Sequence, residues 1–293
     1  MSIARNPGVM DPKTKQAVFD CTAGSVGGIG QVFAGQPFDT IKVRMQTQPH
    51  LYKGTLDCLK KSIANDGVLG LYKGTLSPLM GVGLCVSIQF FTMEHMKRTF
   101  HTKNNGLDLT MPQLFISGAT AGIANSIVSG PVEHVRTRLQ VQTAAVGGGK
   151  QLYSGTFDCI KQIYGQYGLL GLYKGQAPTL VREFFGYGAY FSAYEFLVQK
   201  ELARTGLKRD QLPSWQVCLY GSAAGFSMWL SCYPIDAIKS KIQTDGFGSS
   251  RKYNGMFDCL RKTLANEGVG GLFRGLSPCL LRAAPANAAT FIW

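Results

Sequence analysis

The chain has 293 residues, of which 45% are hydrophobic and only 16% are charged, against about 25% charged in typical soluble domains. Its formal net charge is +13, which suits a nucleic acid, an anionic lipid surface or an acidic ligand as partner. No Lys/Arg run, zinc-ligand spacing or RNA-binding aromatic motif occurs, so the sequence argues against nucleic acid and favours a membrane protein.

The eight cysteines give no sign of a disulfide framework. Cys58, Cys159 and Cys259 stand at equivalent positions of an internal repeat, and no Cys-x-x-Cys pair occurs. We therefore expect all eight to be reduced. The first 20 residues contain no apolar signal-peptide core, and prolines and Asp11 stand among their few basic residues. We expect neither a signal peptide nor a cleavable transit peptide.

The chain consists of three copies of one unit. One block reads YKGTLDCLKKSIANDG from Tyr52, YSGTFDCIKQIYGQYG from Tyr153 and YNGMFDCLRKTLANEG from Tyr253. A second block precedes each of these and reads PFDTIKVRMQ, PVEHVRTRLQ and PIDAIKSKIQ. We predict three repeats at 1–104, 105–207 and 208–293, the third looking truncated at its C-terminal end.

Each repeat contains two segments with few or no charges, at 21–38, 74–93, 109–132, 176–194, 211–235 and 275–293. Most have the length of about 20 residues that a helix needs to cross a bilayer, and the first can continue past Pro37. A buried core helix would explain any one segment, but six in a regular pattern argue against it. The sequence predicts an all-α membrane protein with six transmembrane helices in three two-helix repeats of pseudo-threefold symmetry. Three short surface helices are expected to begin near Tyr52, Tyr153 and Tyr253.

Charge and small residues predict orientation and packing. The connections at 42–73, 136–174 and 239–274 hold more than half of the 30 Lys and Arg residues, which predicts that they face the matrix if the membrane is mitochondrial. Small residues let membrane helices approach closely. They recur at equivalent positions: Gly24 and Gly28, Gly118 and Gly122, Gly221 and Gly225 on the first helices, and Cys85, Gly186 and Ala286, with Ser87, Gly188 and Ala288, on the second.

A charged motif follows each first segment. In the first repeat Pro37 kinks the helix, and Asp39, Lys42 and Gln46 then share one helical face because they are three and four residues apart. The motif recurs at Pro131, Glu133, Arg136 and Gln140, and at Pro234, Asp236, Lys239 and Gln243. Since charges are costly in lipid, we expect the three acids and three bases to pair from helix to helix in a closed ring. The alternative is a set of local pairs at the membrane surface.

A further motif follows each surface helix: Asp66-Gly67 with Tyr72-Lys73-Gly74, Tyr167-Gly168 with Tyr173-Lys174-Gly175, and Glu267-Gly268 with Phe273-Arg274-Gly275. Together with the charged motif, it makes the chain resemble the mitochondrial carrier family from about Asp20 to its end. The resemblance implies three two-helix repeats around a central cavity and alternating access, in which an ion-pair network closes each mouth in turn. The charged motif described above would be the matrix gate.

The resemblance also implies cardiolipin sites on the matrix side. Helix N-termini there offer free amides to lipid phosphate, although turn geometry is an alternative reason for the glycines. The residues implied are Gly54, Tyr72, Lys73, Gly74, Gly155, Tyr173, Lys174, Gly175, Gly255, Phe273, Arg274 and Gly275.

Some positions depart from the family pattern. Tyr167 stands where an acid is usual. On the outer side, the expected gate residues are Glu94, Lys97 and Glu195, with Val198 in place of a base. The third outer acid would fall at position 295, beyond Trp293. We therefore expect a weak outer gate.

The charges within the second segments predict the substrate. Arg182, Glu183 and Arg282 lie about 10 Å into the membrane at about 1.5 Å per residue, where an ionisable residue points to function. The first repeat has Gly81 and Val82 at the equivalent positions, which we include as substrate-binding candidates. We expect Arg282 to bind a substrate carboxylate and Glu183 its ammonium group, with Arg182 as a second anion contact or balancing Glu183. A structural Glu183–Arg282 pair is the alternative.

An Arg-acid pair on the fourth helix with Arg on the sixth resembles the amino-acid, ornithine and carnitine–acylcarnitine branch of the family. We expect exchange of zwitterionic or basic amino acids between cytosol and matrix, by a monomer of the inner membrane. A carnitine carrier is an alternative, because aromatic faces favour a quaternary ammonium. The candidate aromatic residues are Phe184, Phe185, Tyr187 and Tyr190.

Other classes of protein fit less well. No catalytic constellation, metal-ligand cluster or phosphate loop occurs, so we expect no enzyme, cofactor or metal. A non-transporting membrane scaffold would lack substrate-type charges in its cavity. A proton-leak protein is a further alternative, with Glu183 as the proton carrier.

Overall fold

The structure, a computed structural model, describes residues 12–105, 107, 109–142, 152–206 and 211–282, with no description of the side chains of 12–27 and Ser214. Within these ranges the chain is helical and contains no strand. The long helices are α1 (Pro12–Thr47), α3 (Leu76–Lys103), α4 (Met111–Val141), α6 (Gln176–Thr205) and α7 (Ser214–Thr244). The short ones are α2 (Thr55–Asp66), α5 (Thr156–Leu172) and α8 (Met256–Glu267), with 3-10 turns η1 (Val68–Tyr72), η3 (Gly248–Ser250) and η4 (Val269–Phe273).

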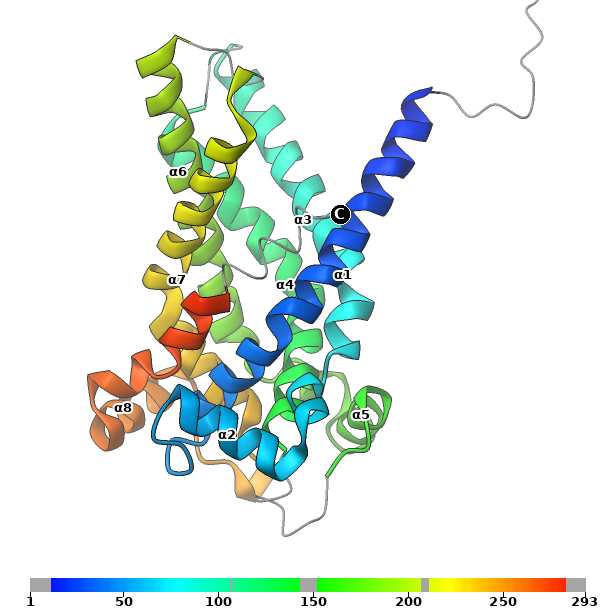
Figure 1. The fold of residues 1–293 in the computed structure, drawn as a ribbon, viewed down its shortest axis with the longest axis vertical. Coiled ribbons are helices and arrows are strands. Elements are labelled where there is room, and N and C mark those ends of the chain that lie inside the picture. The colour runs from blue at the N-terminus through cyan, green and yellow to red at the C-terminus, as the bar shows by residue number, and fades with distance from the viewer. Residues whose placement is uncertain (1–11, 106, 108, 143–151, 207–210, 283–293) are drawn as a thin grey trace, which may run out of the picture.

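The long helices form a bundle that is narrow at one end and wide at the other. Figure 1 shows them converging at the bottom, where α2, α5 and α8 lie across their ends, and diverging towards the top. Helix α4 packs against α3 and α6, and α6 packs against α7. Residues 276–282 begin a further helix, and most of the last predicted segment lies outside the described residues.

Each predicted proline kink lies inside a continuous helix. Pro37, Pro131 and Pro234 are interior residues of α1, α4 and α7, so these helices extend beyond the segments predicted from hydropathy. A proline removes one backbone hydrogen bond and bends the helix there. The bend brings the following turns of the three helices together at the narrow end (Figure 1).

Three equivalent apolar clusters attach the short helices to the long ones. Each cluster contains one cysteine of a short helix. These cysteines, Cys58, Cys159 and Cys259, are completely buried. All described cysteines are free. Burial raises the pKa of the Cys58 thiol to about 11 and that of Cys159 to about 12, so these thiols stay neutral and behave as small apolar residues.

The glycines of the matrix-side motif have a structural reason. Gly74, Gly175 and Gly275 have φ between 80 and 84°, a left-handed conformation that glycine adopts without strain. They also lie against the next long helix: a Cβ on Gly74 would be 3.0 Å from the backbone oxygen of Arg136. Turn geometry therefore accounts for these glycines, whether or not a lipid also binds there.

Close packing by small residues is found in the second repeat. A Cβ on Gly118 would lie 2.9 Å from the backbone oxygen of Tyr187, and one on Gly122 would lie 2.8 Å from that of Glu183. Among the described residues, no atom lies within 4 Å of a Cβ on Gly225, so its predicted packing role stays a prediction. Gly24, Ala286 and Ala288 lie outside the residues described with side chains.

One described helical stretch, Val68–Lys103, is long and apolar enough by composition to cross a membrane. Many large apolar side chains are nevertheless exposed on the bundle, among them Phe91 at 75% and Ile127 at 60%.

Candidate functional site

A closed ring of ion pairs joins α1, α4 and α7 at the narrow end. Lys42 Nζ of α1 is 2.7 Å from Asp236 Oδ2 of α7. Arg136 Nη2 of α4 is 2.7 Å from Asp39 Oδ2 of α1, and Lys239 of α7 pairs with Glu133 of α4. Each helix thus gives its base to one neighbour and its acid to the other. We call these six residues the ion-pair ring. Each of its pairs joins two different helices, so the alternative prediction of local pairs at the membrane surface is wrong.

The glutamine of each motif is buried beside the ring, but the three make different bonds. Gln46 Nε2 donates to Asp236 Oδ2 at 3.3 Å and so touches a ring pair directly. Gln140 Nε2 donates to Thr40 Oγ1 at 3.2 Å, and Gln243 Oε1 accepts from Thr137 Oγ1 at 3.4 Å.

Further ring contacts have no signal in the sequence. Gln36, fully buried, accepts a hydrogen bond from Arg136 and donates to the carbonyl oxygen of Lys73 at 3.1 Å. Lys42 Nζ lies 4.1 Å from the centre of the Trp229 ring, a cation–π contact. The repeat positions equivalent to Gln36 carry Gly and Tyr, so repeat symmetry could not have identified it.

A second layer of ion pairs lies below the ring in two repeats. Arg44 Nη2 is 2.9 Å from Asp66 Oδ2, and Lys241 pairs with Glu267. The second repeat has Tyr167 in place of the acid. There Arg138 donates to His134 Nε2 at 2.7 Å and to the carbonyl oxygen of Asp245 at 2.6 Å.

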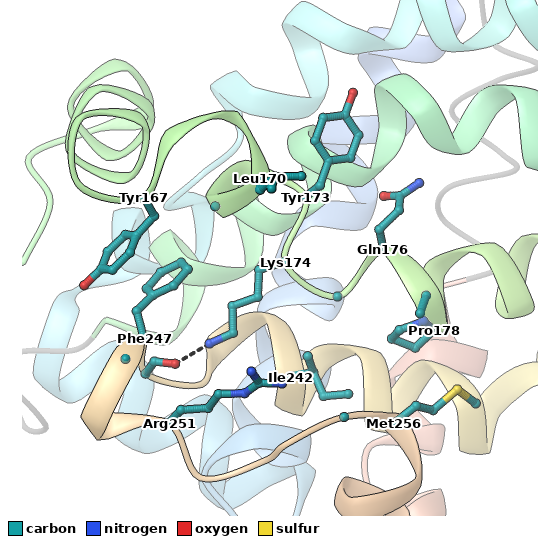
Figure 2. A pocket seen from close by; sticks show the side chains of 16 residues that line it. Tyr167, Leu170, Tyr173, Lys174, Gln176, Pro178, Ile242, Phe247, Arg251 and Met256 are labelled. Atoms are coloured by element: carbon teal, nitrogen blue, oxygen red, sulfur yellow. Dashed lines mark hydrogen bonds between the residues drawn. The ribbon is translucent and has the colours of Figure 1, made fainter.

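Figure 2 shows the aromatic replacement for that acid. Tyr167 stacks on Phe247 with ring centres 4.1 Å apart, and Lys174 Nζ lies 4.4 Å from the centre of the Phe247 ring. Arg138 lies 4.5 Å from the same ring. Burial, then the charge of Arg138, lowers the pKa of Lys174 to about 8. The two cations here bond to carbonyl oxygens and lie against an aromatic face, and the nearby carboxylate of Asp245 also favours their charged forms.

The predicted lipid-site residues gather where neighbouring repeats meet. Tyr173, Lys174, Gly175 and Gly255 line a cavity of about 460 Å³ between the second and third repeats (Figure 2). A smaller cavity of about 250 Å³ between the first and second repeats is lined by Tyr72, Lys73, Gly74 and Gly155. At the third junction Arg274 Nη2 donates to the carbonyl oxygens of Pro49 and Tyr52 at 2.9 and 2.6 Å, close in sequence to Gly54. Phe273 and Gly275 flank Arg274.

Two cavities lie along the bundle axis, the inner one at the ring and the outer one towards the wide end. The inner cavity, of about 290 Å³, contains the ring residues together with Arg182, Glu183, Arg282, Asn125 and Ser129. The outer cavity, of about 720 Å³, is lined mainly by aromatic and small residues, including Tyr190, Phe191, Tyr194 and Phe226. Tyr187, Trp229 and Arg282 line both cavities and so form the boundary between them.

The cavity arginines are bound to the acids of the ring. Arg182 pairs with its neighbour Glu183, its Nη2 is 3.3 Å from Glu133 Oε1, and its Nε is 3.9 Å from Asp236 Oδ1. Arg282 Nε is 3.2 Å from Asp39 Oδ1. The alternative prediction of a Glu183–Arg282 pair is therefore wrong for this structure, because Glu183 pairs with Arg182 and Arg282 pairs with Asp39.

The inner cavity has an excess of positive charge. Its described lining contains four carboxylates, from Asp39, Glu133, Glu183 and Asp236, and five cations, from Lys42, Arg136, Arg182, Lys239 and Arg282. Its formal charge is therefore positive by one.

Other predicted residues lie away from the cavities. Gly81 is packed against Val132, and Val82 lies 3.4 Å from where a Cβ of Gly28 would be, so both occupy helix interfaces and neither lines the inner or the outer cavity. Close packing of α3 against α1 and α4 takes up these positions. Of the candidate aromatic residues, Tyr187 and Tyr190 line a cavity, whereas Phe184 packs against Phe115 and Phe185.

Within the part of the chain that the structure describes, Glu94, Lys97 and Glu195 form no ion pair with one another across helices. Glu94 Oε1 pairs with Arg98 of the same helix at 3.0 Å, with both side chains more than half exposed. Glu195 accepts from Gln199 Nε2 at 3.5 Å on α6. Lys97 lies on α3 beside this pair, and the helices diverge at this end (Figure 1).

The family model described as "Mitochondrial carrier protein" matches residues 13–104, 107–202 and 210–293 of the chain. The chain is 49% identical to the glutamate/glycine mitochondrial carrier of Schizosaccharomyces pombe, over 97% of this chain and 95% of that protein. It is 40% identical to the mitochondrial basic amino acids transporter of Homo sapiens, over 93% and 87% of the two chains. It is 38% identical to the mitochondrial carnitine/acylcarnitine carrier protein of Rattus norvegicus, over 96% and 94%.

Proposed function

Since the chain belongs to the mitochondrial carrier family, we propose that it exchanges zwitterionic or acidic amino acids across the mitochondrial inner membrane by alternating access. It is a transport protein rather than an enzyme. The charge of the inner cavity carries the proposal of substrate class. An amino acid without net positive charge leaves the excess unchanged or cancels it, whereas a basic amino acid would raise it.

The chain is a multi-pass protein in this proposal. Charged side chains of α1, α4 and α7 pair with one another inside the bundle, which removes them from lipid. Large apolar side chains such as Phe91 and Ile127 are exposed instead. The basic connections then lie on the matrix side. The described lining of both cavities comes from all three repeats of one chain, which favours a monomer.

The structure then corresponds to a state closed towards the matrix and open towards the cytosol. The ion-pair ring closes the narrow end, while at the wide end the ion pair of Glu94 within the described chain is with Arg98 of its own helix. Substrate would enter through the outer cavity and reach the inner one past Tyr187 and Trp229. Opening to the matrix requires the ring pairs to separate.

Substrate binding can weaken the ion-pair ring because Arg182 and Arg282 contact ring acids and are also the proposed substrate-binding residues. A carboxylate binding Arg282 with bidentate geometry competes with Asp39 Oδ1, now 3.2 Å from Arg282 Nε. An ammonium group binding Glu183 competes with Arg182, which also holds Glu133 and lies near Asp236. Each end of a zwitterion would thus weaken a contact to the ring, which couples binding to opening.

A carnitine ester is the second candidate substrate. The outer cavity is aromatic and, at about 720 Å³, has room for an acyl chain next to Tyr187 and Tyr190. A carnitine/acylcarnitine carrier is also among the relatives.

Cardiolipin is the proposed lipid partner of the matrix-side junctions. Lys174 and Arg251 both line the cavity of Figure 2, next to the first turn of α8 after Gly255. The backbone amides of that turn and the two cations would bind a phosphate.

Exchange in proteoliposomes tests the function. The purified protein, in vesicles loaded with unlabelled glycine, is supplied with labelled glycine, glutamate, arginine or carnitine. We expect uptake of glycine or glutamate, loss of uptake in Arg282→Ala and normal uptake in Lys61→Ala on the exposed face of α2. Uptake of carnitine alone would favour the second candidate. Uptake of none, or a proton leak without exchange, would refute the proposed transport.

A further inference from the structure

Polar atoms without a partner line one side of the inner cavity. Asn125 Oδ1, Ser129 Oγ and Glu183 Oε2 are buried and accept or donate no hydrogen bond within the described chain. Their residues are 5%, 7% and 1% exposed. A buried polar atom without a partner is costly, so a ligand that supplies the missing bonds would be favoured.

These atoms come from facing sides of α4 and α6. Asn125 and Ser129 are four residues apart on α4 and therefore share a helical face. The two helices touch one turn earlier, where a Cβ on Gly122 would lie 2.8 Å from the backbone oxygen of Glu183. This close approach brings the Glu183 side chain to the same side of the cavity as the two α4 residues.

Other hydroxyl residues of α4 bond within the protein. Ser117 Oγ donates to the carbonyl oxygen of Gln113 at 2.7 Å, and Thr137 Oγ1 to that of Glu133 at 2.7 Å. Ser126 Oγ donates to the carbonyl oxygen of Ile123 at 2.7 Å. A purely structural role for Ser129 would predict a similar bond, which its hydroxyl does not make.

The three repeats carry different residues at the positions of Asn125 and Ser129, and these differences put the oxygen atoms and Arg282 on different sides of the cavity. The equivalents of Ser129 are Gly35 and Cys232, and those of Asn125 are Gln31 and Met228. A Cβ on Gly35 would be 2.6 Å from Arg282 Nε, so the absence of a side chain leaves room for the guanidinium. The oxygen atoms of the described cavity residues that have no partner thus come from the second repeat, whereas Arg282 lies against the first.

We propose that Asn125, Ser129 and Glu183 form a subsite for the primary ammonium group of an amino-acid substrate, opposite a carboxylate bound by Arg282. A primary ammonium has three N–H donors, which match the three oxygen atoms of the subsite. A quaternary ammonium has no N–H donor and would leave these atoms unpaired. The subsite therefore selects amino acids against their N-trimethyl analogues. This inference rests on the proposed function, since it names residues within the same cavity.

Competition by paired probes tests the subsite. Unlabelled glycine and N,N,N-trimethylglycine compete with labelled glycine for uptake into proteoliposomes containing the full-length protein. We expect the inhibition constant of glycine for the wild type to be at least about tenfold lower than that of N,N,N-trimethylglycine. Losing hydrogen bonds to a charged group costs about 1.5 kcal/mol or more, which corresponds to about tenfold in affinity. Asn125→Ala and Ser129→Ala should each lower this preference several-fold.

Two further variants separate recognition from folding. Asn125→Asp keeps the size and an acceptor oxygen, so it should retain the preference for glycine. Thr120→Val removes an exposed hydroxyl that bonds to the carbonyl oxygen of Ile116, and should leave both inhibition constants unchanged. If Asn125→Ala does not fold, Asn125→Asp and Ser129→Ala still test the proposal.

The outcomes distinguish the two proposals. An unchanged preference in both alanine variants, with glycine uptake intact in the wild type, would overturn the subsite alone. If the wild type takes up carnitine and no amino acid, the proposed function fails and the subsite with it.

Discussion

Removing one partner of the Lys42–Asp236 pair tests whether the ion-pair ring stabilises the closed form. Lys42→Gln deletes a cation whose side chain is 7% exposed and leaves the 8% exposed Asp236 without its nearest counter-charge. Asp236 keeps Gln46 Nε2 at 3.3 Å and Arg182 Nε only at 3.9 Å. Deleting one partner of a buried pair costs about 3–5 kcal/mol, because the remaining charge is uncompensated. We expect the free energy of unfolding to fall by this amount.

Thermal unfolding in detergent, arranged as a double-mutant cycle, measures the effect. Lys42→Gln, Asp236→Asn and the double variant are compared with the wild type. Because the double variant removes both charges, we expect it to be less destabilised than the sum of the single variants, by about 1–3 kcal/mol. Lys61→Gln is the matched control: its pair with Asp57 is on the surface, with Lys61 45% exposed, and should contribute little. Strict additivity in the cycle, or a Lys42→Gln effect no larger than that of the control, would refute the reasoning.

Three further predictions concern the cavity and the lipid junction. Arg282→Ala should lower amino-acid exchange at least about tenfold with little loss of thermal stability, since Asp39 keeps Arg136; a large fall in stability would contradict this. Lys174 has a pKa of about 8, so the stabilisation of the protein by cardiolipin, measured by thermal shift, should decrease as pH rises from 7 to 9 and stay constant in Lys174→Arg. In the absence of lipid, the stability of the protein should change with pH in the opposite direction. Because the pKa of Lys174 is lowered from 10.5 to about 8, the folded form binds fewer protons than the unfolded chain between these pH values, and the free energy of unfolding should rise with pH there. Tyr167→Glu should shift the midpoint of the cardiolipin effect to higher pH, because a carboxylate near Lys174 favours its charged form; an unmoved midpoint would show that the two side chains are not coupled.

The ring residues could be predicted from the sequence because their information is local and repeated. Spacing of three and four residues after a proline puts acid, base and glutamine on one helical face, and threefold recurrence makes pairing between helices the natural outcome. The helices α2, α5 and α8 begin within a few residues of the predicted starts for the same reason.

The partners within the cavity depended on tertiary structure. Whether Arg282 meets Asp39 or Glu183, and whether Gly81 lines the cavity or packs against Val132, is decided by the relative rotation and tilt of helices far apart in the chain. Spacing along one helix carries no such information. Asn125 and Ser129 have no charged counterpart in the other repeats, so only their burial without a partner in the folded chain identifies them. The sequence by itself thus determined the repeats, the ring and the charges of the cavity, and the packing of the helices decided which of those charges face one another.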